Sequence, residues 1–215
     1  MRIATGALLA AALLALTACS SSDEPKKAAP PPEPAKIEHA PAVFRVNLDT
    51  TKGPIVVEVH TAWAPYGADH FHTLVKSGFY DGVRFYRVVR NYVAQFGING
   101  VPAVNRIWSS AGLPDDSVKQ SNLRGTLTYA NSGPSTRTTQ LFINMKNNKD
   151  LDQSRFAPIG KVIEGMDVVD RLYFLYGDTP PRGSGPDARA IETDGNDYLI
   201  AQFPRLDYIR KATVQ

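Results

Sequence analysis

The sequence predicts a mainly β domain with a few helices, on three observations. Apolar and polar side chains alternate over residues 44–49, as in a half-buried strand, and alternate apolar residues recur over 55–59. The turn-forming residues 50–53 between them indicate that the two strands pair as a hairpin. Two further strand-like pieces, Val83–Val89 and Tyr92–Phe96, flank the short polar break at Arg90 and Asn91.

The composition is that of a soluble globular protein. The chain has 215 residues, of which 43% are hydrophobic and 21% charged, and its net charge is +3. This charge is small and scattered, so we expect no nucleic-acid partner. The length suits one domain preceded by an N-terminal segment.

The first residues have the pattern of a secretion signal. Arg2 supplies a basic start, and Ile3–Leu16 is an apolar segment too short to span a bilayer comfortably. Residues 16–19, Leu-Thr-Ala-Cys, resemble the lipobox of bacterial lipoproteins and contain the only cysteine of the chain. The resemblance implies cleavage before Cys19 and its lipidation, and two or three acyl chains anchor a protein stably. An ordinary signal peptide with a chance cysteine is the alternative.

We therefore expect a lipoprotein signal peptide at 1–18, a lipidated cysteine with a Pro-rich linker at 19–42, and a folded domain at 43–215. The linker favours extended polyproline II at about 3.1 Å per residue, so it reaches roughly 70 Å from the membrane. Ser20 stands where Asp retains lipoproteins at the inner membrane. This favours the outer membrane, facing the periplasm, with the outer face of the inner or plasma membrane as the alternative.

Helices are expected at three places. Pro65 can begin the first, apolar residues recur at helical spacing from Ala68 to Val75, and Gly78 marks its end. The apolar residues of the second are Val162, Met166, Val169 and Leu172. A third, short and amphipathic, is expected within residues 191–202.

Two segments are expected to be loops, because residues 98–119 and 177–187 are rich in Gly and Pro, the first also in Asn and Ser. Trp108 lies in the first of them and is expected to pack in the core, with a place on the rim near the site as the alternative. Residues 206–214 offer a last strand.

The histidines predict no metal site. His70 and His72 are two apart on the expected helix, so they point to different faces, and no carboxylate or cysteine stands at a ligand spacing. Together with His60 they are expected at the surface or half-buried, while His39 lies in the linker.

Residues 85–97 carry the chemistry. Arg87 lies inside an apolar, β-branched run, and Val93 and Gln95, two apart on the next strand, share a face. This predicts a guanidinium beside an apolar floor with an amide close by to orient it, which suits catalysis by hydrogen bonding. The alternative is an exposed, paired arginine, which is how most arginines occur. The stretch alone leaves both open.

Three stretches together resemble the cyclophilins, the prolyl cis–trans isomerases, over about residues 43–175 and the last strand. They are residues 85–97, FYRVVRNYVAQFG; residues 124–131 with 140–144, RGTLTYAN and QLFIN; and residues 151–162. The departures from the common family pattern are Tyr92 for Phe, Val93 for Met, Phe96 for Gly, Asp150 for Trp and Phe156 for His.

The resemblance implies a closed eight-stranded antiparallel barrel capped by two helices. Residues 177–204 exceed the minimal family fold, so we expect an insertion with a short extra helix that packs on the barrel, or contacts a partner. The implied activity is peptidyl-prolyl cis–trans isomerisation of X–Pro bonds in extracytoplasmic proteins, assisting their folding. The implied partners are proline-containing segments; no cofactor or metal is expected, and the protein is expected to be a monomer.

The resemblance also implies the site. Arg87 is the expected catalytic residue. The expected substrate-binding residues are Tyr92, Val93, Gln95, Ala130, Asn131, Gln140, Phe142, Leu151 and Phe156. The alternative function is a chaperone or binding module on the same fold with little turnover. A purely structural envelope lipoprotein leaves Arg87, Gln95, Asn131 and Gln140 unexplained together.

Overall fold

The computed structural model describes residues 36–110 and 112–215. The expected signal peptide, Cys19 and most of the linker lie outside the described residues. The elements are β1 Val43–Thr50, β2 Gly53–His60, α1 Pro65–Lys76, β3 Arg87–Val89, β4 Val93–Phe96, α2 Pro102–Ser109, β5 Thr126–Tyr129, β6 Leu141–Asn144, the 3-10 helix η1 Lys149–Ser154, β7 Pro158–Glu164, α3 Met166–Asp170, α4 Ala188–Gln202 and β8 Ile209–Val214. None of the described helices is long and apolar enough to cross a bilayer.

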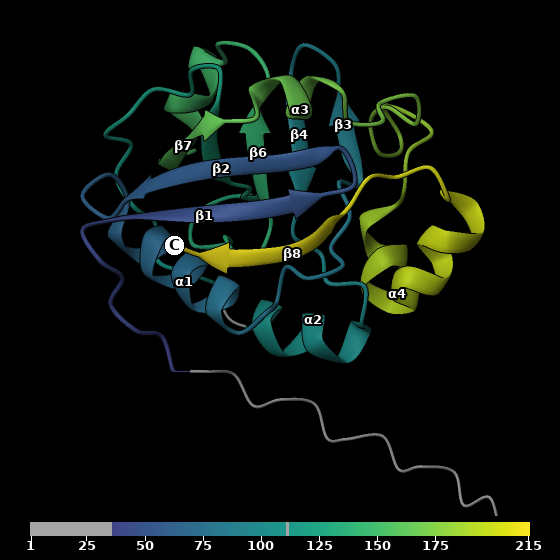
Figure 1. Cartoon of the computed structure of the whole chain (residues 1–215), viewed down its shortest axis with the longest axis horizontal. Coiled ribbons are helices and arrows are strands. Elements are labelled where there is room, and N and C mark those ends of the chain that lie inside the picture. Colours follow the sequence, from purple (N-terminus) through teal and green to yellow (C-terminus); the bar gives the residue numbers. More distant parts are fainter. Residues whose placement is uncertain (1–35, 111) are drawn as a thin grey trace, which may run out of the picture. The chain divides into compact units, whose positions relative to one another are not determined.

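All eight strands belong to one antiparallel sheet, in the order β3-β4-β6-β5-β7-β2-β1-β8. The sheet curls, and the segments beside its two edge strands meet through a bridge between Arg84 and Tyr208 (Figure 1). On either side of this bridge, the Phe85 N–H donates to the Asp207 carbonyl at 2.9 Å and the Ile209 N–H to the Val83 carbonyl at 2.9 Å. The predicted mainly β, eight-stranded antiparallel fold is confirmed. The sheet is a curled half-barrel, and this short ladder joins the segments beside its two edge strands.

The first hairpin and the first helix follow the sequence pattern. β1 pairs with β2 without a break from Val43 opposite His60 to Thr50 opposite Gly53. α1 begins at Pro65, where the missing N–H would have had no helical partner. It lies at one end of the curled sheet, and α3 lies at the other (Figure 1).

A buried carboxylate ties α1 to the loop that precedes β6. Asp116 accepts hydrogen bonds from the backbone N–H groups of Tyr66 and Gly67, at 3.1 and 2.9 Å. The buried guanidinium of Arg137 donates to the same carboxylate through Nη1 at 3.0 Å. The Asp116 carboxylate at the start of α1 is thus paired with Arg137. This ion pair also fixes the loop of residues 132–139, which leads to β6.

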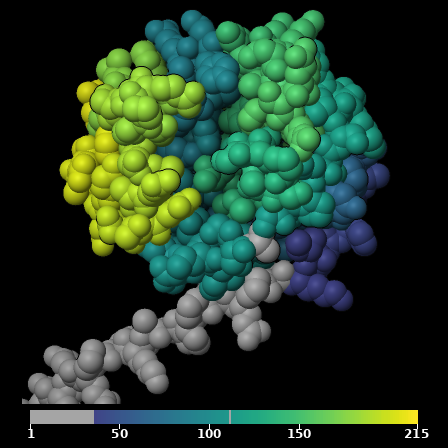
Figure 2. Space-filling view, turned by 180° about the vertical axis from the view of Figure 1, so that it is seen from behind, coloured from purple at the N-terminus to yellow at the C-terminus, as the bar shows by residue number. Residues whose placement is uncertain are grey.

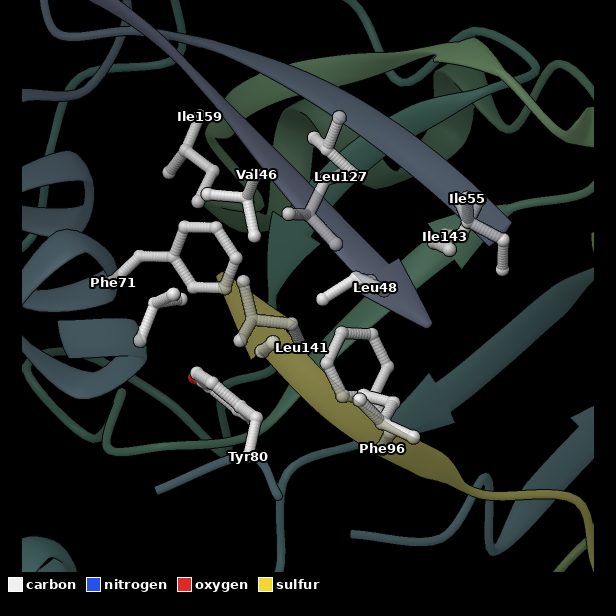
Figure 3. Close-up of a cluster of buried hydrophobic side chains, with 14 of the residues drawn as sticks. Val46, Leu48, Ile55, Phe71, Tyr80, Phe96, Leu127, Leu141, Ile143 and Ile159 are labelled. Carbon is white, nitrogen blue, oxygen red and sulfur yellow. The ribbon is translucent and has the colours of Figure 1, made fainter. Parts of the chain in front are cut away.

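The main core fills the inside of the curled sheet. Its labelled members in Figure 3 are fully buried: Val46, Leu48, Ile55, Phe71, Tyr80, Phe96, Leu127, Leu141, Ile143 and Ile159. They come from β1, β2, β4 to β7, α1 and the turn after it. Alternate residues of β1 and β2 face this core, as the period-two pattern predicted.

A second, smaller core holds the C-terminal insertion. Its buried members are Tyr86, Ile98, Ile191, Leu199 and Leu206. α4 bends at Gly195, whose backbone is non-helical, and there the Asn196 N–H donates to the Gly100 carbonyl at 2.8 Å. A side chain at position 195 would collide with that carbonyl. The insertion packs on the barrel, which was the favoured of the two expectations.

Two element predictions were wrong. The expected loop at 98–119 contains α2, which begins at Pro102 and buries Trp108 against the core; the Gly- and Pro-rich flanks hid this eight-residue helix. The expected second helix is only the five residues of α3, because Val162 belongs to β7 and pairs with Val57 of β2. Glycine at 165, with φ 89°, separates the strand from the helix.

The histidines on α1 are buried, which corrects the expectation of a surface or half-buried position. Burial, and to a lesser extent the Arg137 cation, lowers the pKa of His70 to about 4, so its ring is neutral at pH 7. Its Nδ1 lies 3.2 Å from the Tyr129 hydroxyl. Within the described part of the chain no three His, Cys, Asp or Glu side chains are placed to hold a metal ion.

The end of the linker is attached to α1. Asp69 accepts the Ala40 N–H at 2.8 Å, and its other oxygen lies 2.8 Å from Nδ1 of His39. The chain therefore enters the domain along α1.

Gly97, directly after β4, lies where the chain passes very close to the residues that precede β6. Its φ is +111°, and a side chain there would collide with the Thr139 carbonyl and lie 2.7 Å from Cα of Gln140. We expect Gly97→Ala to lower the free energy of unfolding by about 2–5 kcal/mol, from backbone strain and overpacking together. The measurement is denaturant unfolding.

Gly82→Ala is the matched control, since Gly82 also has a positive φ, +78°, but nothing lies within 4 Å of the added carbon. It should lose only about 1–2 kcal/mol, the cost of the left-handed backbone. Equal losses in both variants would contradict the close approach.

Candidate functional site

One cavity gathers all ten residues singled out in the sequence. Its volume is about 560 Å³, and it lies between the insertion and the strands β3, β4 and β6. Figure 2 shows this face of the molecule hollowed between the lime-to-yellow insertion and the green segments. Its lining includes Arg87, Tyr92, Val93, Gln95, Ala130, Asn131, Gln140, Phe142, Leu151 and Phe156.

Strand register places the central three side chains in a row. Arg87 on β3 is the cross-strand partner of Gln95 on β4, and Gln95 is the partner of Phe142 on β6. Because directly paired residues project from the same face, all three turn toward the cavity. Nη1 of Arg87 donates to Oε1 of Gln95 at 3.0 Å, and the ring of Tyr92 lies 5.7 Å from the guanidinium carbon.

The floor beside this row is apolar. Val93 and Phe142 are buried, and the rings of Phe142 and Phe156 pack edge to face with centroids 5.6 Å apart. η1 carries Leu151, and the residue after it, Arg155, has a left-handed backbone (φ 63°) that turns the chain just before Phe156. These residues form a small apolar pocket next to the guanidinium of Arg87.

Above the floor, three polar side chains bind one another. Nε2 of Gln95 donates to the Tyr86 hydroxyl at 2.6 Å, and this hydroxyl donates to Oε1 of Gln140 at 2.6 Å. Burial raises the pKa of Tyr86, so its hydroxyl keeps its proton at neutral pH. The amides of Gln95 and Gln140 are thereby held in fixed orientations.

Residues 130 and 131 form the rim. The Ala130 N–H donates to the Gln140 carbonyl at 2.9 Å, which continues the β5–β6 pairing. The Asn131 side chain donates to the Ser154 carbonyl at 3.4 Å and accepts a hydrogen bond from the Gly133 N–H at 3.3 Å.

The insertion supplies a wall that the sequence analysis missed. Its cavity-lining residues are Thr179, Arg182, Ala188, Arg189 and Glu192. Just before them, Asp178 forms a two-point ion pair with Arg87: Oδ1 lies 2.5 Å from Nε and Oδ2 lies 3.2 Å from Nη2. The Arg87 hydrogen bond and charge hold the pKa of Asp178 below its usual range, so it is ionised at neutral pH.

Neither Asp178 nor Tyr86 had a local signal. Asp178 is 91 positions from Arg87 and sits in a Gly/Pro-rich segment that looked like a plain loop. Tyr86 immediately precedes Arg87, and regular alternation would turn neighbouring side chains to opposite faces. It reaches Gln140 because β3 begins only at Arg87.

This arrangement can act by hydrogen bonding without making bonds. An arginine has five N–H donors and stays charged at any physiological pH, and Asp178 and Gln95 accept three of them. Two donors remain beside the apolar pocket. The lining contains no cysteine and no serine–histidine pair for nucleophilic catalysis.

Comparison with known proteins points to one family. The family model described as cyclophilin type peptidyl-prolyl cis-trans isomerase/CLD matches residues 45–182. The match therefore includes all ten predicted site residues and Asp178, but not α4 or β8.

Similar proteins carry the same description. A peptidyl-prolyl cis-trans isomerase of Acinetobacter baylyi is 37% identical over 139 residues, which is 62% of this chain and 74% of that protein. The isomerase ppi1 of Schizosaccharomyces pombe is 34% identical over 146 residues, 66% of this chain and 92% of that protein. A crystal structure of a cyclophilin type isomerase from Cryptosporidium parvum shares the fold, with a TM-score of 0.58 at 18% identity over 80% of this chain and 98% of that one.

The Tyr86 hydroxyl offers a direct test of the polar network. We expect Tyr86→Phe to lower the free energy of unfolding by about 1 kcal/mol, because Nε2 of Gln95 and Oε1 of Gln140 then keep only their direct bond of 3.1 Å. Denaturant unfolding measures this. Tyr92→Phe is the control, since the Tyr92 hydroxyl makes no hydrogen bond within residues 36–110 and 112–215; a loss as large there would contradict the network.

Proposed function

Since the chain belongs to the cyclophilin type peptidyl-prolyl cis-trans isomerase family, we propose that its cavity turns X–Pro bonds with Arg87 as the essential donor. The chain is an isomerase of the cyclophilin type, acting on proline-containing peptides. The observation that carries the role of Arg87 is the row Arg87–Gln95–Phe142 across three strands, with a cation at one end and an apolar pocket at the other.

The reaction has one physical obstacle. An X–Pro bond turns slowly because resonance between nitrogen and carbonyl sets a barrier of about 18–20 kcal/mol. At the twisted transition state the nitrogen becomes pyramidal and regains a lone pair. A donor aimed at that lone pair stabilises the twisted state more than either planar state, which is the condition for catalysis.

Arg87 meets this condition through its two remaining donors. Its charge is permanent and its plane rigid, so no proton transfer, nucleophile or cofactor enters the step. The guanidinium side chain is only 11% exposed, which strengthens the interaction by keeping water away.

The rest of the cavity holds the substrate while one end of it turns. We assign the proline ring to the pocket formed by Val93, Phe142, Leu151 and Phe156, with Tyr92 at the edge. We assign the neighbouring peptide to the amide of Gln140 and the backbone of Asn131. All of these groups belong to one chain, so the proposed site works in a monomer.

We also propose that the enzyme acts outside the cytoplasm as a membrane-tethered lipoprotein. The support is the basic and apolar start of the chain, the lipobox-like run that ends at Cys19, and the Pro-rich segment after it. None of residues 36–42 lines the cavity, so their attachment to α1 leaves it open to client proteins.

Substitution of Arg87 tests the catalytic role. We expect Arg87→Ala to lower kcat/KM for a short X–Pro peptide by about 10²–10³, in line with the loss of one aimed donor, while peptide binding persists. A prolyl-bond assay and a titration of the same peptide measure the two quantities. Arg87→Lys should restore little, because an ammonium lacks the planar fork.

Arg90→Ala is the matched control: it removes an arginine of the same stretch that lies outside the cavity, against the ring of Phe174. It should keep the wild-type rate. An unchanged rate in Arg87→Ala would refute the role of Arg87. A wild-type protein that binds the peptide without turning it would favour the binding-module alternative.

The tether has its own test. In a host that processes lipoproteins, the mature N-terminus should be an acylated Cys19 and the protein should sediment with membranes, in the outer-membrane fraction where the host has one. Cys19→Ala should leave the protein unacylated. Mass spectrometry of the N-terminal peptide and fractionation measure this, and an unmodified Cys19 would contradict the proposal.

A further inference from the structure

The loop that carries Asp178 is built closely around it. The Thr179 N–H donates to Oδ1 of Asp178 at 2.8 Å, and the Gly185 N–H donates to the Asp178 carbonyl at 2.9 Å. A side chain at position 183 would collide with the Asp178 carbonyl, so this position requires glycine. These contacts set the position of the carboxylate before any substrate arrives.

The ion pair restrains Arg87 in a way that Gln95 cannot. Oδ1 and Oδ2 meet Nε and Nη2 side by side, and this two-point contact fixes the plane of the guanidinium. Gln95 holds only Nη1 and alone would leave the plane free to turn. The side chains of Arg87 and Asp178 are 11% and 18% exposed, so water competes little for the pair.

We propose that Asp178 is a positioning residue for prolyl isomerisation: it fixes the guanidinium of Arg87 so that its two remaining N–H donors face the twisted prolyl nitrogen. The inference rests on the proposed function of Arg87. It makes the insertion, through Asp178, part of the machinery that orients the donor.

The contact between Asp178 and Arg87 also has an effect that opposes catalysis. A carboxylate beside Arg87 weakens the positive field at the transition state, so a brake on catalysis is the competing interpretation. Two features limit this cost. Oδ2 of Asp178 also lies 3.4 Å from Nε of Arg182, which shares the negative charge, and the free N–H donors act by direction over a short distance.

A merely structural role is a second competitor. The insertion has its own buried core, with Ile191, Leu199 and Leu206, and α4 docks at Gly100 independently of Asp178. Loss of the carboxylate should therefore leave the fold in place. Positioning and structure can then be separated by substitutions that keep the shape.

The experiment compares Asp178→Asn, Asp178→Glu and the wild type in the full chain. Asparagine keeps the shape but turns a donor toward a donor of Arg87, so one of the two bonds is lost. We expect kcat/KM for an X–Pro peptide to fall about 10- to 100-fold, the cost typical of a misplaced catalytic group. The dissociation constant of the peptide and the Tm should stay near those of the wild type.

Asp178→Glu restores a carboxylate on a longer arm and should recover part of the rate. Asp194→Asn is the matched control, because it removes the same charge from an exposed position of α4 outside the cavity and should keep the full rate. If Asp178→Asn fails to fold, the rate of Asp178→Glu decides: a wild-type rate would overturn the proposal, and an intermediate rate would support it.

Nuclear magnetic resonance of the Arg87 Nε–H supplies a readout that a structural role would not move. In the wild type and Asp194→Asn this proton should be shifted downfield and exchange slowly with water, and in Asp178→Asn it should exchange fast. An active wild type with an equal or faster Asp178→Asn overturns the positioning role and leaves Arg87 as the donor. An inactive wild type instead overturns the proposed function itself.

Discussion

The restraint of one guanidinium is the constraint on which the site depends. Arg87 is held by Gln95 through one donor and by Asp178 through two, with the ring of Tyr92 alongside. A cation on a long side chain would otherwise sample many rotamers and point at solvent. The role proposed for Arg87 involves no proton transfer or covalent bond, so it depends on the direction in which the guanidinium N–H groups point.

The register of the strands determines where Arg87 and its neighbours Gln95 and Phe142 lie. β3, β4 and β6 pair so that Arg87, Gln95 and Phe142 stand side by side, and a slip of one strand by one residue would send its member of the row to the opposite face. Just beyond β4, Gly97 passes close to Thr139 and Gln140, which immediately precede β6. Strand pairing alone therefore brings the side chains of Arg87, Gln95 and Phe142 to one face of the sheet.

The insertion changes the cavity more than its size suggests. Its residues Ile191 and Leu199 share a small core with Tyr86, and its Asp178 forms the ion pair with Arg87. Tyr86 then passes the restraint inward to Gln95 and Gln140 through its hydroxyl. The insertion, whose composition indicated only a loop and packing, thus contacts both Tyr86 and Arg87.

The sequence by itself determined the first hairpin and the start of α1, because alternation along a strand and a proline at a helix start are local signals. The ten residues that share the cavity were identified from short motifs that resemble one family. The sequence analysis missed α2, where Gly and Pro in the flanks masked a short helix, and it extended α3 backward into β7. Only the tertiary structure decided the partner of Arg87 and the depth of His70. Asp178 meets Arg87 across 91 positions of chain, and His70 is buried by Tyr129 and Trp108 from distant elements. Contacts between segments so far apart are set by how the sheet curls and the insertion docks, and no local pattern of residues records that.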